Sequence, residues 1–411
     1  MERPIVAIDV GTTKICTLVG EVGENGDLRV IGVGVVAAQG LYKSEITDVE
    51  EAAEAIGRAV QRAEQVSGHT VTEAYVGIGG GHISSQNSRG VVAIGKGDRP
   101  IDRDDIDRAM ESALAITLPH NRRVIHCSPR EFIVDGHDGV KNPLGLMGFR
   151  LEVEAHIITG AGTSIQNIIH CVEMNEIEVV RLVAQPLASA EAVLTEEEKT
   201  MGVVMIDIGA GTTDLAICVE GSPWETQVLR VGGNQLTRDI AVGLRTPLAT
   251  AEDLKVRYAH AAPETIDEDE KIEITTFGDG GRSTVSRRTL CGVLGARMEE
   301  MLELIAREVK RSGFGGLLAA GVVITGGTAN LRGIRDVAAE LLQLPVRIGM
   351  PRRLRGLTET ISSPAYATSV GLLLWGMRER AGTMERGPRA ARRGTWYRRL
   401  ADWLKVFLPR G

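Results

Sequence analysis

One phrase occurs twice in this chain and constrains its fold more than any other feature. Residues 205–217 read MIDIGAGTTDLAI, and residues 7–19 read AIDVGTTKICTLV, a shorter version of the same phrase. In each, an apolar β-rich run leads to an Asp and a turn of small residues, and a second β-rich run follows. This is the pattern of a strand–turn–strand hairpin. One such hairpin in each half of the chain predicts a duplicated domain whose two copies face each other.

Length and composition agree with two α/β domains. A chain of 411 residues is long for a single core. Aromatic residues make up only 3% of it, so the core must consist of Ile, Val, Leu and Ala, which suits buried parallel sheets covered by helices. A later segment, 321–342, reads as a strand, a Gly–Gly turn and a helix. Apolar residues at three- and four-residue spacing predict helices over 47–68, 163–176, 189–199 and 295–313.

The texture of the sequence changes at two places. Between residues 85 and 159, strand-like and helix-like runs describe a small α+β unit that interrupts the first domain. After Trp375 the chain becomes rich in Arg, Gly and Pro, which is typical of a flexible linker. The predicted divisions are a first domain (1–84 and 160–197), an inserted subdomain (85–159), a second domain (198–228 and 300–377) with an accessory subdomain (229–299), a basic linker (378–394) and a terminal helix (395–411).

The paired turns are suited to hold phosphate groups. Glycine lets backbone N–H groups approach oxygen atoms without a Cβ in the way, and Thr adds a hydroxyl donor. Asp9 and Asp207, at the entrances of the turns, could hold the water shell of Mg²⁺, and Lys14 could add a point charge. The residues predicted for the phosphate site are Gly11, Thr12, Thr13 and Lys14 in the first turn and Gly209, Gly211, Thr212 and Thr213 in the second.

A single turn of this kind is a weak signal, because any tight hairpin favours Asp and Gly. Two turns followed by ITGGTANL at 324–331 are much harder to explain by chance. Gly326 and Gly327 of that segment would let the backbone lie flat along an adenine and a ribose.

The order of two Asp-x-Gly turns, a connecting helix and a late Gly–Gly turn resembles the actin, Hsp70 and sugar-kinase superfamily of ATPases. This resemblance implies an α/β, actin-like (ribonuclease H-like) fold, duplicated in two domains, with the α+β subdomain inserted in the first half. More narrowly, nearly the whole chain resembles the FtsA family of bacterial cell-division proteins, and the inserted unit and the tail are its most specific parts. Arg130 departs from the family's PQEF-like motif. The segments that carry the resemblance are HCSPREFIVDGHDGVKNPLGLMGFRLEVEAHIIT, LVAQPLASAEAVL, TPLATAEDLKVRYAHA, RIGMPRRLRGLTE and GTWYRRLADWLKVFL.

The resemblance implies that ATP and Mg²⁺ bind between the two domains. Glu252 and Lys255 match the helix that contacts the ribose and adenine in this family, and Gly233 and Asn234 are assigned to the same site. Catalysis in the family tends to be slow, so the nucleotide is expected to act mainly as a structural switch. Whether the chain is an enzyme beyond a slow ATPase stays open.

Two residues are candidates for catalysis, Gln185 and Asp207. Gln185 stands where actin-like ATPases place the residue that orients the attacking water. The other interpretation of Gln185 is a helix cap beside Pro186, and the sequence does not separate the two.

The last residues predict an amphipathic helix that lies in a membrane interface. Plotted at about 100° per residue, one arc is apolar and aromatic and the opposite arc is largely basic. Residues 378–411 hold ten Lys and Arg against three Asp and Glu, a balance of +7, so the rest of a chain with net charge −7 carries −14. The alternative is a helix that docks on its own body, which the long basic linker disfavours. The residues predicted to contact the membrane are Trp396, Leu400, Trp403, Leu404 and Phe407 on the apolar arc and Arg398, Arg399 and Lys405 on the basic arc.

Other signals bear on compartment and metals. The five cysteines are widely spaced, and the histidines show no metal-ligand spacing, so neither a disulfide framework nor a zinc site is expected. The sequence shows no signal peptide and no apolar stretch long enough to span a bilayer, so a cytoplasmic protein is expected.

The family resemblance also implies partners and a location. It implies binding of the C-terminal peptide of the tubulin-like division protein FtsZ to the accessory subdomain, where Arg287, Arg288 and Arg297 are either contacts or ordinary solvated side chains. It implies self-association, further division proteins and anionic lipid as partners, with no nucleic acid. The expected location is the cytoplasmic face of the plasma membrane at the division septum.

Three alternatives remain on the same scaffold. A sugar or acid kinase would need a substrate cleft with a catalytic Asp and would have no use for the terminal helix. An Hsp70-like chaperone would need a peptide-binding domain, for which no residues remain after Trp375. A pilus-assembly or rod-shape scaffold is disfavoured by the inserted unit and by the C-terminal position of the amphipathic helix.

Overall fold

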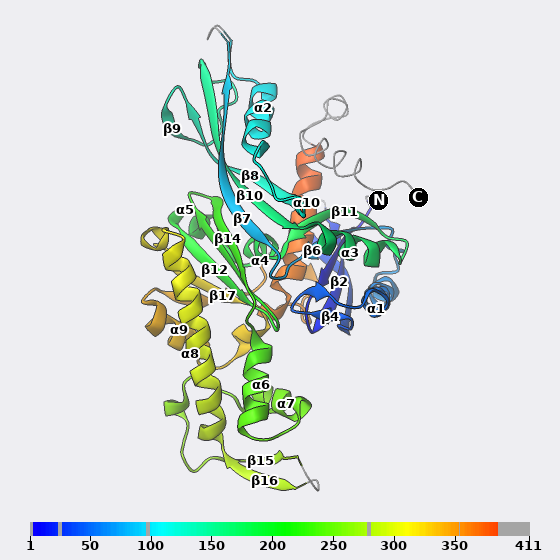
Figure 1. Cartoon of the computed structure of the whole chain (residues 1–411). Coiled ribbons are helices and arrows are strands. Elements are labelled where there is room, and N and C mark those ends of the chain that lie inside the picture. The colour runs from blue at the N-terminus through cyan, green and yellow to red at the C-terminus, as the bar shows by residue number, and fades with distance from the viewer. Residues whose placement is uncertain (1–2, 24–26, 96–98, 278–280, 353, 385–411) are drawn as a thin grey trace.

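The structure is a computed structural model that describes residues 3–23, 27–95, 99–277, 281–352 and 354–384. Figure 1 shows two α/β halves side by side, with the inserted subdomain above them and the accessory subdomain below the second half. The order of elements along the chain therefore agrees with a duplicated domain that carries one insertion in each half.

A six-stranded sheet forms the first half. Strands β1 (Ile5–Val10), β2 (Lys14–Val22) and β3 (Leu28–Ala37) pair antiparallel in this order. Strand β6 (Glu73–Ile78) runs parallel to β1 and to β11 (Glu178–Ala184). One face packs on helices α1 (Val49–Ser67) and α3 (Gly162–Glu173). The strand order is β11 (Glu178–Ala184), β6 (Glu73–Ile78), β1 (Ile5–Val10), β2 (Lys14–Val22), β3 (Leu28–Ala37) and β19 (Leu354–Gly356).

Helix α1 illustrates why the predicted helix over 47–68 forms where it does. The Asp48 carboxylate accepts the Glu51 N–H at 3.0 Å and caps the start, and Gly68 ends the helix with a φ of 72°. The helix lies close on β3, because a Cβ on Gly34 would stand 1.9 Å from the Ala59 carbonyl oxygen.

A five-stranded sheet forms the second half and repeats the arrangement. One face packs on α6 (Gly233–Gly243), α8 (Arg287–Arg311) and α9 (Ile334–Leu342). The strand order is β14 (Ser222–Leu229), β13 (Thr213–Val219), β12 (Val203–Ile208), β17 (Val322–Thr325) and β18 (Val346–Ile348).

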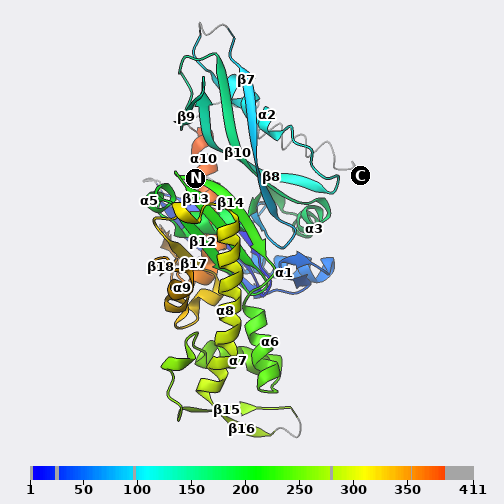
Figure 2. The ribbon, with the colours of Figure 1, turned by 60° about the vertical axis from the view of Figure 1, so that its left-hand side comes forward.

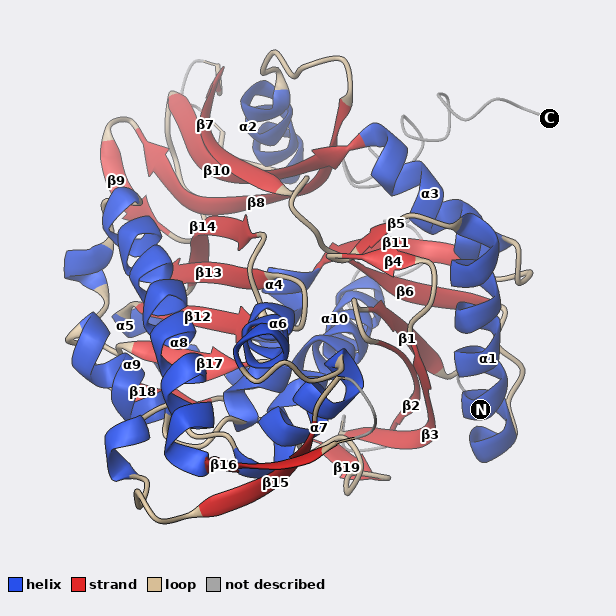
Figure 3. Cartoon of the chain, turned by 60° about the horizontal axis from the view of Figure 1, so that its bottom comes forward, coloured by secondary structure: helices blue, strands red, loops and turns tan. Residues whose placement is uncertain are grey.

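Helices α4 (Gln185–Val193) and α10 (Ala367–Met384) lie between the two sheets and join the halves (Figure 3). They share one core with the inner faces of β1 and β12, which are buried on both sides and therefore read as continuous apolar runs. The helices cross in direct contact, since a Cβ on Gly371 would lie 1.7 Å from the Ala188 carbonyl oxygen. This shared core joins the two halves along one side of the cleft between them.

The inserted unit is an antiparallel sheet covered by one helix, so the predicted α+β insertion in the first half is confirmed. Figure 2 shows it above the second half. It has its own core, with Met110, Leu151 and Ile157 fully buried. Its elements are β7 (Ser84–Ala93), α2 (Arg103–Leu114), β8 (Arg122–Val134), β9 (His137–Val140) and β10 (Arg150–Ala161), in the sheet order β7-β10-β8-β9.

The accessory subdomain contains two short helices and a hairpin beside one end of α8. The predicted helix over 295–313 begins earlier, at Arg287, and α8 runs from the accessory subdomain back to the second half, across the predicted division at residues 299 and 300. The remaining elements of the subdomain are α6 (Gly233–Gly243), α7 (Leu248–Tyr258), β15 (Lys271–Thr275) and β16 (Arg282–Ser286).

Two sequence predictions need correction. The helix predicted over 189–199 is two helices, because the Thr195 hydroxyl caps a new one, α5 (Glu196–Met201), after α4 has ended. The linker was predicted to begin at residue 378, but α10 continues to Met384. In this part of the helix, Arg378 pairs with Glu191 at 2.5 Å and Arg380 donates to the Pro4 carbonyl at 3.1 Å. The terminal helix over 395–411 lies outside the described residues. None of the helices in the described part of the chain is long and apolar enough to cross a bilayer.

Candidate functional site

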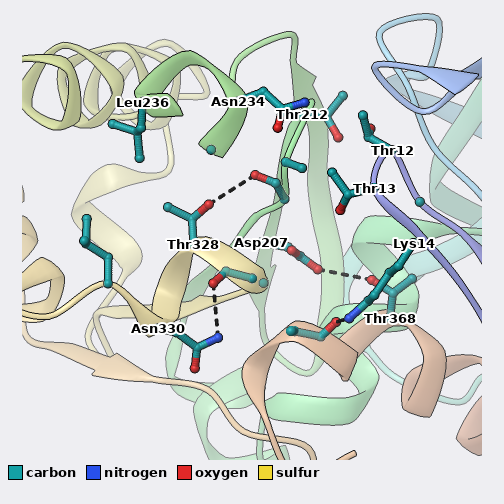
Figure 4. Close-up of a pocket in the computed structure, with 18 of the residues that line it drawn as sticks. Thr12, Thr13, Lys14, Asp207, Thr212, Asn234, Leu236, Thr328, Asn330 and Thr368 are labelled. Atoms are coloured by element: carbon teal, nitrogen blue, oxygen red, sulfur yellow. Dashed lines mark hydrogen bonds between the residues drawn. The ribbon is translucent and has the colours of Figure 1, made fainter. Parts of the chain in front are cut away.

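A cleft of about 760 Å³ opens between the halves, in the size range of small-ligand sites (Figure 4). It is walled by both turns, the start of α4, helices α6 and α7, the Gly–Gly turn and the start of α10. The structure therefore brings together residues that the sequence keeps far apart. The predicted residues that line the cleft are Asp9, Gly11, Thr12, Thr13, Lys14, Gln185, Asp207, Gly209, Thr212, Gly233, Asn234, Glu252, Lys255, Gly326 and Gly327.

The first turn places Lys14 at the cleft. The turn closes with the Gly11 N–H donating to the Lys14 carbonyl at 3.0 Å. The Lys14 ammonium donates to the Ala365 carbonyl and lies 3.6 Å from the centre of the Tyr366 ring. Burial lowers the pKa of Lys14, while the negative charge of Asp9 acts in the opposite direction. The result is a cation held at the first turn and shielded from water on one side by an aromatic ring.

The second turn closes in the same way and at the same distance from its Asp-x-Gly. The Gly209 N–H donates to the Thr212 carbonyl at 2.9 Å, so Thr212 occupies the position of Lys14, although the letters GTT stand two residues later than in the first copy. Thr213 pairs across the hairpin with Ile208, as Ile15 does with Val10.

Two predicted phosphate-site residues therefore do not line the cleft. Thr213 is fully buried and donates its hydroxyl to the Val231 carbonyl at 2.9 Å. Gly211 packs against the first half, since a Cβ there would lie 2.5 Å from the Thr12 Oγ1 and 2.8 Å from the Lys43 Cα.

Asp9 and Asp207 are both buried beside the cleft. Burial raises the pKa of Asp9 to about 6, and the charge of Asp207 adds to this, whereas the hydroxyl of Ser369, at 2.8 Å, lowers it. Burial also raises the pKa of Asp207, against hydroxyl bonds from Ser189 at 2.6 Å and Thr368 at 3.2 Å. Each carboxylate is thus costly to ionise here without a cation nearby.

A third carboxylate, Asp214, was not among the predicted site residues, although it directly follows the letters GTT in the second copy of the phrase. It lies directly across the hairpin from Asp207 and lines the cleft. Its Oδ1 is buried with no hydrogen-bond partner, and burial followed by the charge of Asp207 raises its pKa well above the usual range. The signal was available as the final Asp of DIGAGTTD.

This donor set fits Mg²⁺ held through waters. Within the described ranges, no group of three or more His, Cys, Asp or Glu side chains is placed to hold a metal ion by itself. Mg²⁺ does not require such a group, because it keeps several waters and takes one or two carboxylates together with phosphate oxygens. The unpartnered Asp214 oxygen and the raised pKa values of Asp9 and Asp207 fit a site that holds a cation.

Gln185 faces the cleft from the first residue of α4. Its side chain is buried and donates from Nε2 to the Asp9 carboxylate at 3.2 Å and to the Val10 carbonyl at 3.3 Å. The start of α4 has no side-chain cap, so the structure does not bear out the alternative interpretation of Gln185 as a helix cap.

The other end of the cleft holds an ion pair on α7. The Lys255 ammonium lies 2.7 Å from the Glu252 carboxylate and donates to the Gly233 carbonyl at 3.2 Å and the Thr237 hydroxyl at 2.8 Å. Gly326, with a φ of 87°, allows its turn to press against the second hairpin, because a Cβ there would lie 2.3 Å from the Asp207 carboxylate.

Several lining residues carry no sequence motif at all. They come from loops and helix starts that only the fold brings to the cleft, and no pattern in the sequence could have found them. They include Ser44, Ala365 and Thr368.

Comparison with protein families gives two matches. The family model described as cell division protein FtsA matches residues 204–371, and the model described as the SHS2 domain inserted in FtsA matches residues 80–159. The relative from Pseudomonas aeruginosa named cell division protein FtsA is 41% identical over 382 residues, which are 93% of this chain and 91% of that protein. The relative of the same name from Escherichia coli K12 is 35% identical over 410 residues, 98% of this chain and 97% of that protein.

Solved structures of more distant proteins share the fold. The PilM–PilN type IV pilus biogenesis complex matches with a TM-score of 0.66 at 14% identity, covering 91% of this chain and 98% of that one. MreB5 of Spiroplasma citri bound to AMPPNP matches with a TM-score of 0.58 at 15% identity, covering 94% and 99%. These matches confirm the actin-like α/β fold class.

Proposed function

Because this chain belongs to the FtsA family of cell division proteins, we propose that it is an ATP-binding, actin-like protein that anchors the FtsZ ring to the cytoplasmic face of the plasma membrane at the septum. The observation that carries the nucleotide-binding part is the cleft, where both turns, Gln185 and the Gly–Gly turn meet around one space. The family assignment sets aside the kinase and the pilus or rod-shape scaffold as alternatives.

In this proposal the two turns hold the ATP phosphates from opposite sides. The backbone N–H groups and the Thr12, Thr13 and Thr212 hydroxyls would donate to phosphate oxygens, and Lys14 would supply a positive charge. Asp9 and Asp207 would hold Mg²⁺ through its waters, and the bound ion supplies positive charge between the phosphates and the carboxylates. Glu252 and Lys255 would contact the ribose and adenine.

Slow ATP turnover is consistent with the position of Gln185. Both bonds are donated by its Nε2, to Asp9 and Val10, so Gln185 would orient an attacking water only through its Oε1 unless it gave up one of these bonds. We therefore propose that ATP acts chiefly as a switch and that turnover is slow.

The accessory subdomain is the proposed site for the FtsZ C-terminal peptide. Its candidate arginines are engaged: Arg287 pairs with Glu270 at 2.9 Å, Arg288 with Glu268, and Arg297 with Asp239 at 2.5 Å. A peptide carboxylate that contacts Arg287 or Arg288 would displace Glu270 or Glu268 of this chain. The contact is between charged groups, so binding is expected to weaken as the salt concentration rises. Self-association and contacts with further division proteins belong to the same proposal, and one protein with this fold is described as the MamK double helical filament.

Membrane attachment rests on the sequence of the terminal segment, which lies outside the described residues. Partial burial of aromatic and aliphatic side chains, with about 1 kcal/mol for each basic residue near anionic lipid, gives reversible binding by one copy. Several copies held in a filament would bind far more firmly.

The decisive experiment is co-sedimentation of the full chain with anionic liposomes, with and without Mg·ATP, together with calorimetry of Mg·ATP binding. The truncation is placed after Met384, because a cut at Arg378 would remove contacts of α10 with Glu191 and Pro4. Trp403→Glu changes the apolar arc, and Val406→Glu is its matched control, since Val406 lies on the basic arc.

The full chain and Val406→Glu are expected to pellet with the liposomes, and the truncation and Trp403→Glu to stay in solution, with equal Mg·ATP affinity in all four. Pelleting of Trp403→Glu at the level of the full chain would refute the membrane proposal. Absence of any Mg·ATP binding would refute the assignment of the cleft.

A further inference from the structure

A short hairpin outside both phosphate turns links them across the cleft. It consists of β4 (Leu41–Tyr42) and β5 (Glu45–Ile46) and lies between β3 and α1, so it belongs to the first half. Its two central residues, Lys43 and Ser44, both have positive φ, 50° and 61°. A two-residue turn of this type normally carries Asn or Gly, so this pair is held in the left-handed region by its surroundings.

The first constraint is a pair of hydrogen bonds to the first turn. The Ser44 N–H donates to the Thr12 Oγ1 at 2.9 Å, and the two hydroxyl oxygens lie 3.1 Å apart. Either hydroxyl of this pair can donate. When the Ser44 hydroxyl donates, Thr12 Oγ1 accepts both bonds and its own hydroxyl hydrogen can donate into the cleft, which Ser44 also lines.

The second constraint reaches the other half. The Lys43 ammonium donates to the Arg230 carbonyl at 2.9 Å, just past the end of β14, and the Arg230 guanidinium lies 3.4 Å from the Glu45 carboxylate. The approach is close at the second turn too, where a Cβ on Gly211 would meet both Thr12 and Lys43.

The hairpin therefore contacts the first turn, the second turn and the strand end behind it. The halves are joined on their inner side by α4 and α10, so separating them at the phosphate end would break the contacts of Lys43 and Glu45 with Arg230.

We infer that the hairpin is a strap that holds the cleft closed on a bound nucleoside triphosphate, and that Ser44 is a positioning residue that orients the Thr12 hydroxyl toward the phosphates. Lys43 fastens the strap to the second half. This inference rests on the proposed binding of ATP in the cleft and adds that the strap sets how fast the nucleotide leaves.

The test is the release rate of a fluorescent ATP analogue from the full chain with Mg²⁺, chased with excess ATP in a stopped-flow instrument. Ser44→Ala keeps the Cβ and removes the hydroxyl, and Ser44→Gly also relieves the backbone strain, so at least one of the two is expected to fold normally. Lys43→Ala removes the link to Arg230. Matched controls are the exposed residues of the accessory hairpin, Ser283→Ala and Lys271→Ala.

Release is expected to be roughly five- to tenfold faster in Ser44→Ala and Ser44→Gly and a few-fold faster in Lys43→Ala, the range that the loss of one or two hydrogen bonds produces. Both controls are expected to release at the wild-type rate.

A double variant separates positioning from a general loosening of the fold. If Ser44 acts through Thr12, then Thr12→Val combined with Ser44→Ala releases nucleotide no faster than Thr12→Val alone. Additive effects in the double variant, or wild-type release from both Ser44 variants, would overturn the strap. Failure of the wild-type chain to bind the analogue at equilibrium would instead overturn the assignment of the cleft, and the strap with it.

Discussion

The turn between β1 and β2 and the turn between β12 and β13 close with the same hydrogen bond, from Gly11 to the carbonyl of Lys14 in one and from Gly209 to that of Thr212 in the other. The side chains at the two equivalent positions are nevertheless opposite in character. Lys14 brings a cation to the cleft, whereas Thr212 brings a hydroxyl, and two residues further on Cys16 of the first half is replaced by Asp214 in the second.

This difference teaches how a duplicated scaffold divides one task. Equivalent backbones supply equivalent N–H groups on both sides of the cleft, so either turn can cradle phosphate oxygens. The charges are placed unequally: the first turn adds a positive charge, and the second adds a carboxylate with an unpartnered oxygen. Under the proposed function, Asp9 and Asp207 would hold Mg²⁺ from both turns, Lys14 would add a positive charge for the phosphates at the first turn, and Asp214 would add a negative charge for Mg²⁺ at the second.

The largest effect is expected for Asp207, the Asp that stands directly before the second turn. Asp207→Asn keeps the shape but removes the charge that would hold the waters of Mg²⁺, so the affinity for Mg·ATP should fall about a hundredfold in calorimetry. Asp138→Asn, at an exposed position of strand β9 in the inserted subdomain, is the control and should bind as the wild type does. Unchanged affinity in Asp207→Asn would remove the second turn from the metal site.

The comparison extends to how the inserted subdomain contacts each half. The His126 Nε2 accepts the Ala184 N–H of the first half at 3.0 Å, and the His156 ring contacts the Thr226 hydroxyl of the second half at 3.0 Å. Burial lowers the pKa of both histidines to about 3, with the charge of Arg130 adding to the effect at His156.

A pKa below the unfolded value means that each histidine stabilises the fold fully above about pH 6.5 and that this stability is lost as the pH falls. Between pH 7 and pH 5, the wild type should lose about 2 kcal/mol more of its free energy of unfolding than His156→Gln does. Urea unfolding at the two pH values measures this. Equal losses in the two proteins would mean that His156 is not held neutral at the junction with the second half.

The next effect compares the two equivalent turn positions directly. Lys14→Met should lower the affinity for Mg·ATP about tenfold, because a charged donor to phosphate is lost, and Thr212→Val only about threefold, because a neutral donor is lost. Titration of both variants with a fluorescent ATP analogue gives the ratio. A larger loss in Thr212→Val than in Lys14→Met would reverse the assignment of charge to the first turn.

The smallest effect tests the register of the second turn. Thr213→Val leaves the Val231 carbonyl without its hydroxyl partner, so the free energy of unfolding should fall by about 1 kcal/mol while Mg·ATP affinity stays the same. Thr12→Val should do the reverse, because Thr12 lines the cleft. Weaker Mg·ATP binding by Thr213→Val would return Thr213 to the phosphate site for which the sequence predicted it.

Much of this molecule follows from local patterns. Apolar β-rich runs and Asp-x-Gly turns predict that two hairpins form, since β-rich runs around small residues have few other stable arrangements. Asp9 and Asp207 were predictable because each stands directly before its turn, and the α+β insertion was predictable because its pattern differs from the flanking domains. Asp214 was visible as well, but the sequence does not say which residues of a strand face the cleft.

The tertiary structure decided which of two alignments of the repeated phrase holds. Aligning the letters GTT would equate Thr213 with Thr13, whereas aligning Asp-x-Gly equates it with Ile15. The hydrogen bonds follow the second alignment, so Thr213 turns into the core. A hairpin's register is set by which N–H reaches which carbonyl, and a shift changes the role of each residue of the turn. Ser44 and Thr368 reach the cleft only because packing of α4 and α10 between two sheets brings separate loops to one place, a long-range condensation that no local pattern encodes.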